Sequence, residues 1–171
     1  YCAVRTRHDK ESGIDSKRYP LVLLAENQEG YENLLQLATK AALEGMYYKP
    51  RVDDELLKEH GKGLIALTGP ISGMIPQAAL AEDEERIKEF VEKYQSFFGK
   101  ENFYFELMEL PNVTGQIEVN QQLIHWGKEL NVPVVATCNS HYCNPDDAEA
   151  HDVLLCIQKN AHVDDPSRFS M

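Results

Sequence analysis

The fold is decided by the stretch Gly61-Lys-Gly-Leu-Ile-Ala-Leu-Thr-Gly-Pro-Ile-Ser-Gly73. Its middle, from Gly63 to Thr68, is a short, continuously apolar run of the kind that forms a buried strand. The glycines flank this run, and Lys62 is followed by Gly63 instead of the serine or threonine of a phosphate-binding loop. We therefore expect a buried strand that ends in a glycine- and proline-rich turn over residues 69–76, and not a phosphate cradle.

Similar apolar runs recur on both sides of this strand, each followed by a helical pattern. Further buried strands are expected at residues 20–26, 103–108 and 132–137, and helices at residues 29–43, 53–60, 82–98 and 116–130, with a final helix capped by Asn144. The alternation predicts an α/β fold of parallel strands with outer helices, either an open sheet or a barrel. In such folds chemistry lies at the carboxyl ends of the strands.

Composition narrows the class of protein. The chain has 171 residues, about one domain, and its net charge of −11 argues against a nucleic-acid surface spread over the whole module. No apolar run is long enough to cross a bilayer, and the polar start does not resemble a signal peptide. Four cysteines in such a chain are typical of reduced thiols and predict a cytoplasmic location. Residues 1–18 carry a net positive charge without periodicity and are expected to form an arm or loop.

A cluster of cysteine and histidine follows the strand expected at residues 132–137. Cys138, His141 and Cys143 lie close in sequence, with His151 and Cys156 beyond them. These are the side chains that zinc prefers, so a local zinc site at Cys138 and Cys143 is one interpretation. The spacing matches no familiar zinc knuckle, however, and Cys156 lies in an apolar run where a thiol is usually a core residue. His141 is either a metal ligand at the end of a strand or a hydrogen-bonded loop residue.

Two other groups of residues have a chemical interpretation. Glu106 and Glu109 flank the end of a strand, but their odd separation points them to opposite faces, so they are not expected to act as an acid–base pair. The segment Tyr47-Tyr-Lys-Pro-Arg51 combines basic and aromatic side chains, which can touch a phosphate or stack on a base. Alternatively, the tyrosines cap the preceding helix.

Four segments form a further pattern: residues 21–34 (Leu-Val-Leu-Leu-Ala-Glu-Asn-Gln-Glu-Gly-Tyr-Glu-Asn-Leu), 45–53, 63–69 and 146–158. In this order and spacing they resemble the PHP (polymerase and histidinol phosphatase) domain of bacterial DNA polymerase III alpha subunits. The resemblance implies a distorted seven-stranded β/α barrel, of which residues 1–171 form one PHP domain fragment without the first strands. It also implies that the parent chain is a DNA-directed DNA polymerase, a nucleotidyltransferase of DNA replication.

The resemblance further implies a metal site that has degenerated here. Of four ligand positions in this chain, Pro20, Pro70 and Asn139 replace a histidine, a cysteine and an aspartate, and only His141 keeps its type. We therefore expect no catalytic residue and no cofactor, and instead a scaffold that contacts the rest of the polymerase chain and docks the proofreading exonuclease subunit. The alternative is a zinc- or manganese-dependent phosphoesterase or 3′–5′ exonuclease, completed by residues that precede Tyr1.

Overall fold

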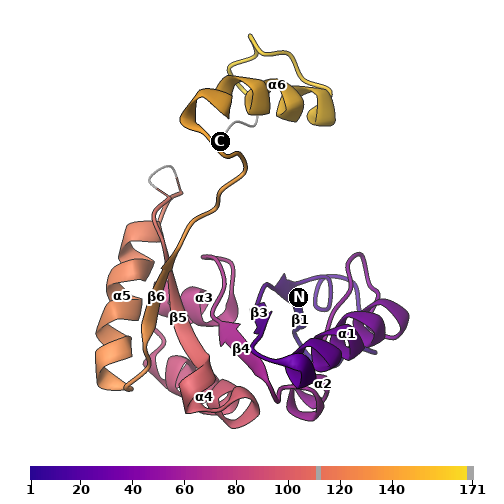
Figure 1. Ribbon diagram of the computed structural model, residues 1–171, viewed down its shortest axis with the longest axis vertical. Helices are drawn as coiled ribbons and strands as arrows, with labels where there is room; N and C mark the ends of the chain where they lie inside the picture. Colours follow the sequence, from indigo (N-terminus) through magenta and orange to yellow (C-terminus); the bar gives the residue numbers. More distant parts are fainter. Residues whose placement is uncertain (111–112, 169–171) are drawn as a thin grey trace. The chain divides into compact units, whose positions relative to one another are not determined.

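The computed structural model describes residues 1–110 and 113–168, which form two compact units, residues 1–137 and 138–171 (Figure 1). Each unit is considered by itself. The strands are β1 (Cys2–Ala3), β2 (Arg18–Tyr19), β3 (Val22–Ala25), β4 (Leu64–Leu67), β5 (Phe103–Met108) and β6 (Val134–Thr137). The α-helices are α1 (Gln28–Leu43), α2 (Asp54–Glu59), α3 (Met74–Leu80), α4 (Glu84–Phe98), α5 (Gln116–Glu129) and α6 (Ala148–Lys159), with short 3-10 turns η1 (Lys100–Asn102) and η2 (Pro145–Asp147). Within the described residues, no helix is both long and apolar enough to cross a membrane.

The main sheet has the strand order β3-β4-β5-β6 and is mixed. Strands β4, β5 and β6 are parallel, as expected, but β3 runs antiparallel to β4, which corrects the expectation of parallel strands throughout. Within the described residues the sheet is open and does not close into a barrel.

The direction of β3 follows from the path of the chain between β3 and β4. Helix α1 leads away from the end of β3, and the segment ending with α2 returns to the same end, where Glu26 N–H donates to Gly63 O at 3.0 Å. The side chain of Asn33, in α1, also donates to Lys62 O at 2.9 Å. Because the chain comes back to the end it left, β4 begins where β3 stops and the pair is antiparallel.

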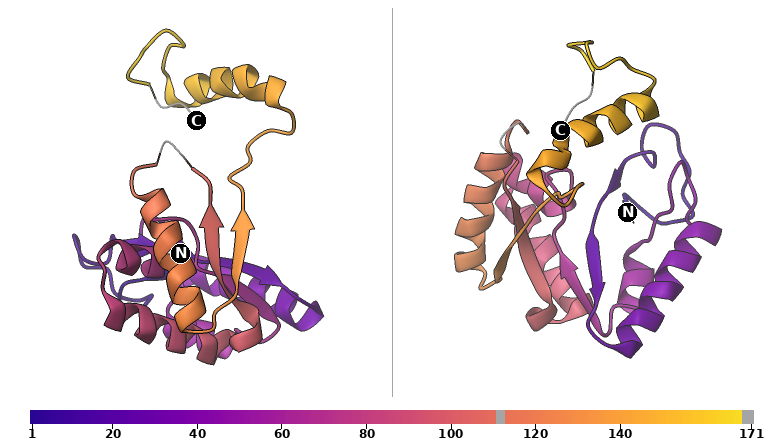
Figure 2. Two further views of the ribbon diagram at one scale, coloured as in Figure 1. Left: turned by 90° about the vertical axis from the view of Figure 1, so that its left-hand side faces the viewer. Right: turned by 45° about the horizontal axis from the view of Figure 1, so that its top comes forward.

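One face of the sheet carries the hydrophobic core, against helices α1, α3, α4 and α5 (Figure 2). The apolar face predicted for residues 82–98 is confirmed, since Ile87, Val91, Tyr94 and Phe98 of α4 are buried. The ring of Tyr94 lies 5.7 Å from that of Phe103, which links α4 to the centre of the sheet. Burial of this aromatic layer fixes which side of each strand faces the helices.

Helix α3 was not expected, because residues 69–76 were interpreted as a turn. Pro76 lies in its first turn, where a backbone N–H has no acceptor within the helix and a proline is tolerated. Ile75, Ala78 and Ala79 of this helix are buried in the core. The proline therefore marks the start of a helix and not an interruption of structure.

The N-terminal arm and the second unit are both more ordered than a bare loop. Residues 1–18 contain β1, whose Cys2 and Ala3 are buried, and begin β2, which pairs antiparallel with β1. In the second unit, Asn144 caps the 3-10 turn η2, which leads directly into α6, and not α6 itself as the sequence suggested. Asn144 and Asp147 form a capping box there, in which Asn144 N–H donates to Asp147 Oδ2 at 3.0 Å.

Candidate functional site at the carboxyl ends of the strands

The carboxyl ends of the parallel strands bring together three polar side chains, Thr68, Glu106 and Thr137. Thr68 Oγ1 accepts the backbone N–H of Glu106 at 2.9 Å, and the Thr137 hydroxyl donates to Glu106 Oε1 at 2.7 Å. Glu106 is only 4% exposed, and its second oxygen, Oε2, is buried without a hydrogen-bond partner in the described part of the chain. A carboxylate with one unpaired oxygen is thus held at the end of the sheet where α/β folds carry their chemistry.

The prediction that Glu106 and Glu109 point apart is confirmed, because Glu106 is buried and Glu109 is exposed. Sequence reasoning nevertheless missed the contacts of Glu106 with Thr68 and Thr137. The available signal was a single charged residue in the otherwise uncharged strand Phe103–Met108. A carboxylate buried in such a strand requires a hydrogen-bonding partner.

Pro20 and Pro70, the two proline positions singled out in the sequence, lie close together beside the end of β4. A Cβ built on Gly73 would lie 3.1 Å from Pro70 O and 3.3 Å from Pro20 O. Gly69 has a φ of +78°, and its own Cβ would lie 2.9 Å from Pro20 O, so only glycine fits this turn without strain. The glycine-rich stretch therefore builds a tight turn, as expected, and the prolines offer only neutral backbone carbonyls as donors.

Asn139 and His141 lie in the second unit, where they contact each other. The distance from His141 Nε2 to Asn139 Oδ1 is 3.1 Å, and the rings of His141 and His151 are 5.4 Å apart. Cys138 and Cys143 are exposed, free thiols. Throughout residues 1–110 and 113–168, no three histidine, cysteine or acidic side chains come together in a way that could hold a metal ion.

The residue types at Pro20, Pro70, Asn139 and His141, the positions that the sequence analysis compared with metal ligands, do not suit a cluster of divalent ions. Two are prolines without a ligating side chain, Asn139 offers a neutral amide oxygen, and only His141 supplies an imidazole. Such a cluster needs several anionic or imidazole ligands to balance its charge. The four side chains supply one such ligand, the imidazole of His141.

Arg51 is not the phosphate contact that its basic and aromatic neighbours suggested, because it is completely buried. Its guanidinium donates to four backbone carbonyl oxygens, those of Arg7 (3.0 Å), Asp9 (2.9 Å), Asp15 (3.0 Å) and Gly45 (3.1 Å). The guanidinium also lies over the ring of Tyr47, 5.3 Å from its centroid. Arg51 therefore fastens the N-terminal segment to the turn after α1 and has little capacity left for an external anion.

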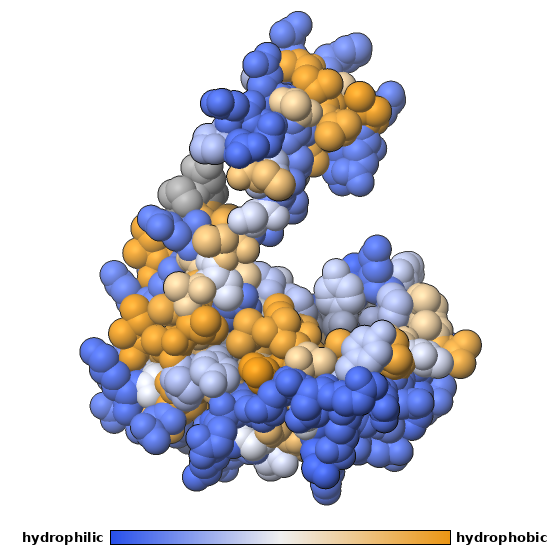
Figure 3. Space-filling view, viewed as in Figure 1, coloured by the Kyte–Doolittle hydropathy of each residue, from blue (hydrophilic) through white to orange (hydrophobic). Residues whose placement is uncertain are grey.

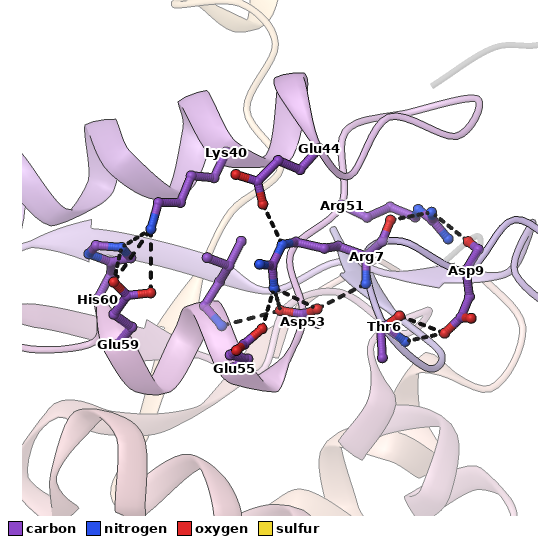
Figure 4. A network of polar contacts seen from close by, with 11 residues as sticks. Thr6, Arg7, Asp9, Lys40, Glu44, Arg51, Asp53, Glu55, Glu59 and His60 are labelled. Atoms are coloured by element: carbon purple, nitrogen blue, oxygen red, sulfur yellow. Dashed lines mark hydrogen bonds and ion pairs between the residues drawn. The ribbon is translucent and has the colours of Figure 1, made fainter.

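A second arginine, Arg7, joins three acidic side chains around the start of α2 (Figure 4). Its guanidinium contacts Glu44 at 2.7 Å, Asp53 at 3.0 Å and Glu55 at 2.7 Å. Asp53 also accepts the backbone N–H of Leu56 at 3.2 Å and so caps α2. Burial acts to raise the pKa of Asp53, but the N–H groups of Arg7 and Leu56 and the charge of Arg7 outweigh it and hold the pKa below its ordinary value. The hydrogen bond from Arg7 likewise lowers the pKa of Glu44.

These lowered pKa values predict that the fold loses stability in acid. The folded state must take up protons on Asp53 and Glu44 at a lower pH than the unfolded chain, whose carboxyl groups titrate near about pH 4. Their contribution is thus complete above about pH 5 and is lost as the pH falls through and below 4. Urea denaturation midpoints measured between neutral and strongly acidic pH should decline over this range.

The Asp53→Asn variant is the control for the acid effect. Asparagine is also a good helix cap, so the variant keeps the start of α2 while removing the titrating group that pairs with Arg7. Its midpoint should lie below that of the parent protein at neutral pH and should depend less on pH. An equal pH dependence in the two proteins would contradict the role assigned to this carboxylate.

Comparison with known proteins gives one consistent result. The chain matches the sequence profile of the PHP domain over residues 2–109. It is 39% identical over 170 residues to the DNA polymerase III subunit alpha of Treponema pallidum, covering 99% of this chain and 14% of the relative. It is 40% identical over 173 residues to the protein of the same name from Thermus aquaticus, with the same coverage. The chain thus spans about a seventh of the length of these relatives.

Proposed function

Because the chain belongs to the PHP domain family, we propose that it forms the PHP domain of a bacterial DNA polymerase III alpha subunit, a DNA-directed DNA polymerase of replication. The observation that carries this proposal is similarity to relatives of that name over 99% of the chain. In the whole protein, the mixed sheet β3–β6 would be part of a distorted β/α barrel, and most of the polypeptide would lie outside residues 1–171.

Within that polymerase we propose a structural and docking role without metal chemistry. The support is the donor set, in which Pro20 and Pro70 bring neutral carbonyls and not side-chain ligands to the end of β4. The charge distribution fits the same role, because Asp83 caps α4 and Glu84 and Glu85 lie in its first turn, so this end of the helix is acidic and unsuited to binding DNA. Such a domain would brace the polymerase and bind the separate proofreading exonuclease subunit.

The test uses the full-length polymerase chain. It should extend a primer, contain no stoichiometric zinc or manganese by elemental analysis, and show no hydrolysis of a 3′-labelled single strand that depends on His141. His141→Ala should therefore leave primer extension, and any residual hydrolysis of the single strand, unchanged. The control His125→Ala, which changes an exposed histidine on α5, should have the same result. Bound manganese or zinc, with hydrolysis lost in His141→Ala alone, would establish the phosphoesterase alternative.

The docking role needs a measurement of its own. Calorimetric titration of the full-length chain with the cognate exonuclease subunit should give saturable binding. Absence of binding would remove this part of the proposal and leave the assignment to the polymerase intact.

A further inference from the structure

A cavity of about 300 Å³ lies in the first unit, where the segment around β1 and β2 meets helices α2, α3 and α4. None of its lining residues belongs to the candidate site at the carboxyl ends of the strands. Its size is at the lower end of the range of about 300–1,000 Å³ that is usual for small-molecule sites. We call it the helix-side pocket.

Part of the wall of the helix-side pocket is apolar. Val4 lines it from the segment that follows β1, Met74 and Ala78 from α3, and Phe90 from α4. Figure 3 shows hydrophilic residues over the lower edge of the first unit, where Figure 1 places α2 and α4, so the apolar wall is a local feature. A concave site that combines apolar walls with a few polar groups is typical of ligand binding.

Two cationic side chains of α4 share one aromatic ring at this pocket. The guanidinium carbon of Arg86 lies 5.6 Å from the ring centroid of Phe90, and Lys93 Nζ lies 5.0 Å from it. The three residues are four and three positions apart, which places them on the same side of the helix. The attraction between a cation and the electrons of the ring helps to keep both charges at the wall of the pocket.

Two of the three cations that line the pocket are already paired with carboxylates. Lys93 Nζ forms an ion pair with Asp54 at 3.0 Å. The guanidinium of Arg5 forms ion pairs with Glu11, at 3.0 Å, and with Asp15. The charges of these two side chains are therefore balanced within the protein.

Arg86 is the third cation, and its charge is not balanced in this way. Its guanidinium forms no hydrogen bond or ion pair with any residue that the structure describes, and its contact is the ring of Phe90. The carboxylate of Asp83 accepts the backbone N–H of Arg86 at 3.1 Å and so serves as the cap of α4. Because the N–H groups of a guanidinium lie in its plane, a guanidinium over a ring keeps them available for a ligand.

The charges of the lining residues indicate which anion suits the pocket. A planar guanidinium matches the two oxygens of a carboxylate, with which it forms paired hydrogen bonds. A phosphate group carries nearly two negative charges at neutral pH and would be repelled by Asp54 and Asp83, which line the same pocket. One unpaired cation beside an apolar wall therefore favours a ligand with one carboxylate and an apolar body.

Beyond the proposed function, we propose that the helix-side pocket binds a small organic monocarboxylate. Its carboxylate accepts hydrogen bonds from the guanidinium of Arg86, and its apolar body lies against Val4, Met74 and Phe90. This assigns a binding site to the helical side of the first unit.

The test is titration of the purified full-length chain with phenylacetate, followed by ligand-observed NMR. Arg86→Gln removes the charge-assisted hydrogen bonds and should raise the Kd at least about tenfold. The matched control is Lys88→Gln, because Lys88 is also an exposed cation of α4 but lies over the ring of Trp126, at 5.2 Å, outside the pocket. The control should change the Kd by less than about twofold. Absence of phenylacetate binding, or equal weakening in the two variants, would overturn the proposal.

Two further ligands test the chemical class at constant ionic strength. Acetate lacks the apolar body and should bind at least about tenfold more weakly than phenylacetate. Inorganic phosphate should not displace phenylacetate. Equal affinity for acetate, or displacement by phosphate, would contradict the assigned class of ligand. Denaturant unfolding of Arg86→Gln should match that of the parent protein, because the side chain is exposed, and this separates lost binding from lost folding.

Discussion

Replacement of Arg51 by alanine is expected to lower the free energy of unfolding by about 3–5 kcal/mol. The guanidinium is completely buried and donates to the carbonyl oxygens of Arg7, Asp9, Asp15 and Gly45. Truncation leaves these acceptors in a cavity without donors, and each unsatisfied buried acceptor costs about 1–3 kcal/mol before the surroundings relax. Denaturant unfolding of the variant and the parent protein measures the difference.

Two further variants separate the charge of Arg51 from its geometry. Arg51→Lys keeps the charge, but one ammonium group cannot reach carbonyls spread around a planar guanidinium, so a substantial part of the loss should remain. Lys49→Ala removes an exposed basic residue from the same segment and should change stability by less than about 0.5 kcal/mol. A loss below about 1 kcal/mol in Arg51→Ala would contradict the fastening role.

The second large effect is expected at Gly30, in the first turn of α1. A Cβ on this residue would lie 1.7 Å from the carbonyl oxygen of Gly63, a backbone atom at the start of β4 that cannot move aside as a side chain could. Alanine ordinarily gains about 1 kcal/mol over glycine within a helix. Here the overlap must push the helix away from the strand and disturb the cap that Asn27 provides to the N–H of Gly30 at 3.0 Å.

The expected result for Gly30→Ala is a net loss of about 2–4 kcal/mol, because overpacking and loss of the cap together exceed the gain in helix propensity. The neighbouring Glu29→Ala is the control, since Glu29 is exposed and its carboxylate pairs with the exposed Lys62. Unfolding curves that place Gly30→Ala at or above the parent protein would show that α1 and β4 do not meet as described.

Most helices and strands could be predicted because the spacing of apolar residues within each segment indicates its secondary structure. The strand Phe103–Met108 has the expected bounds, and α1 and α4 begin within two residues of where periodicity placed them. The direction of β3 could not be predicted in this way, because it depends on the chain returning to Gly63 after α1 and α2, a long-range event without a periodic signal. Helix α3 was missed because Pro76 is unfavourable within a helix but tolerated in its first turn.

In the candidate site, too, the residues near strand ends could be predicted, whereas the contacts between them could not. The sequence places Thr68, Glu106 and Thr137 near strand ends, but their contacts join residues 31 and 38 positions apart. For Arg51 the interpretation as a phosphate contact, one of two alternatives, is wrong, because the side chain is fully buried. Sequence reasoning did not expect this, since charged side chains are seldom fully buried. Its partners are backbone carbonyls, which every residue type possesses and which therefore leave no signature in the sequence.

The attachment of the N-terminal segment has a consequence for how this protein can vary. Since Arg51 recognises main-chain oxygens, the grip on residues 7–15 does not depend on which side chains that segment carries at exposed positions such as His8, Lys10, Ser12 and Ile14. Those positions can accept substitutions, and so acquire new surface properties, while the path of the backbone stays the same. Arg51 itself cannot be substituted without losing these hydrogen bonds. Conservation of this one residue therefore allows the exposed side chains of residues 7–15 to vary.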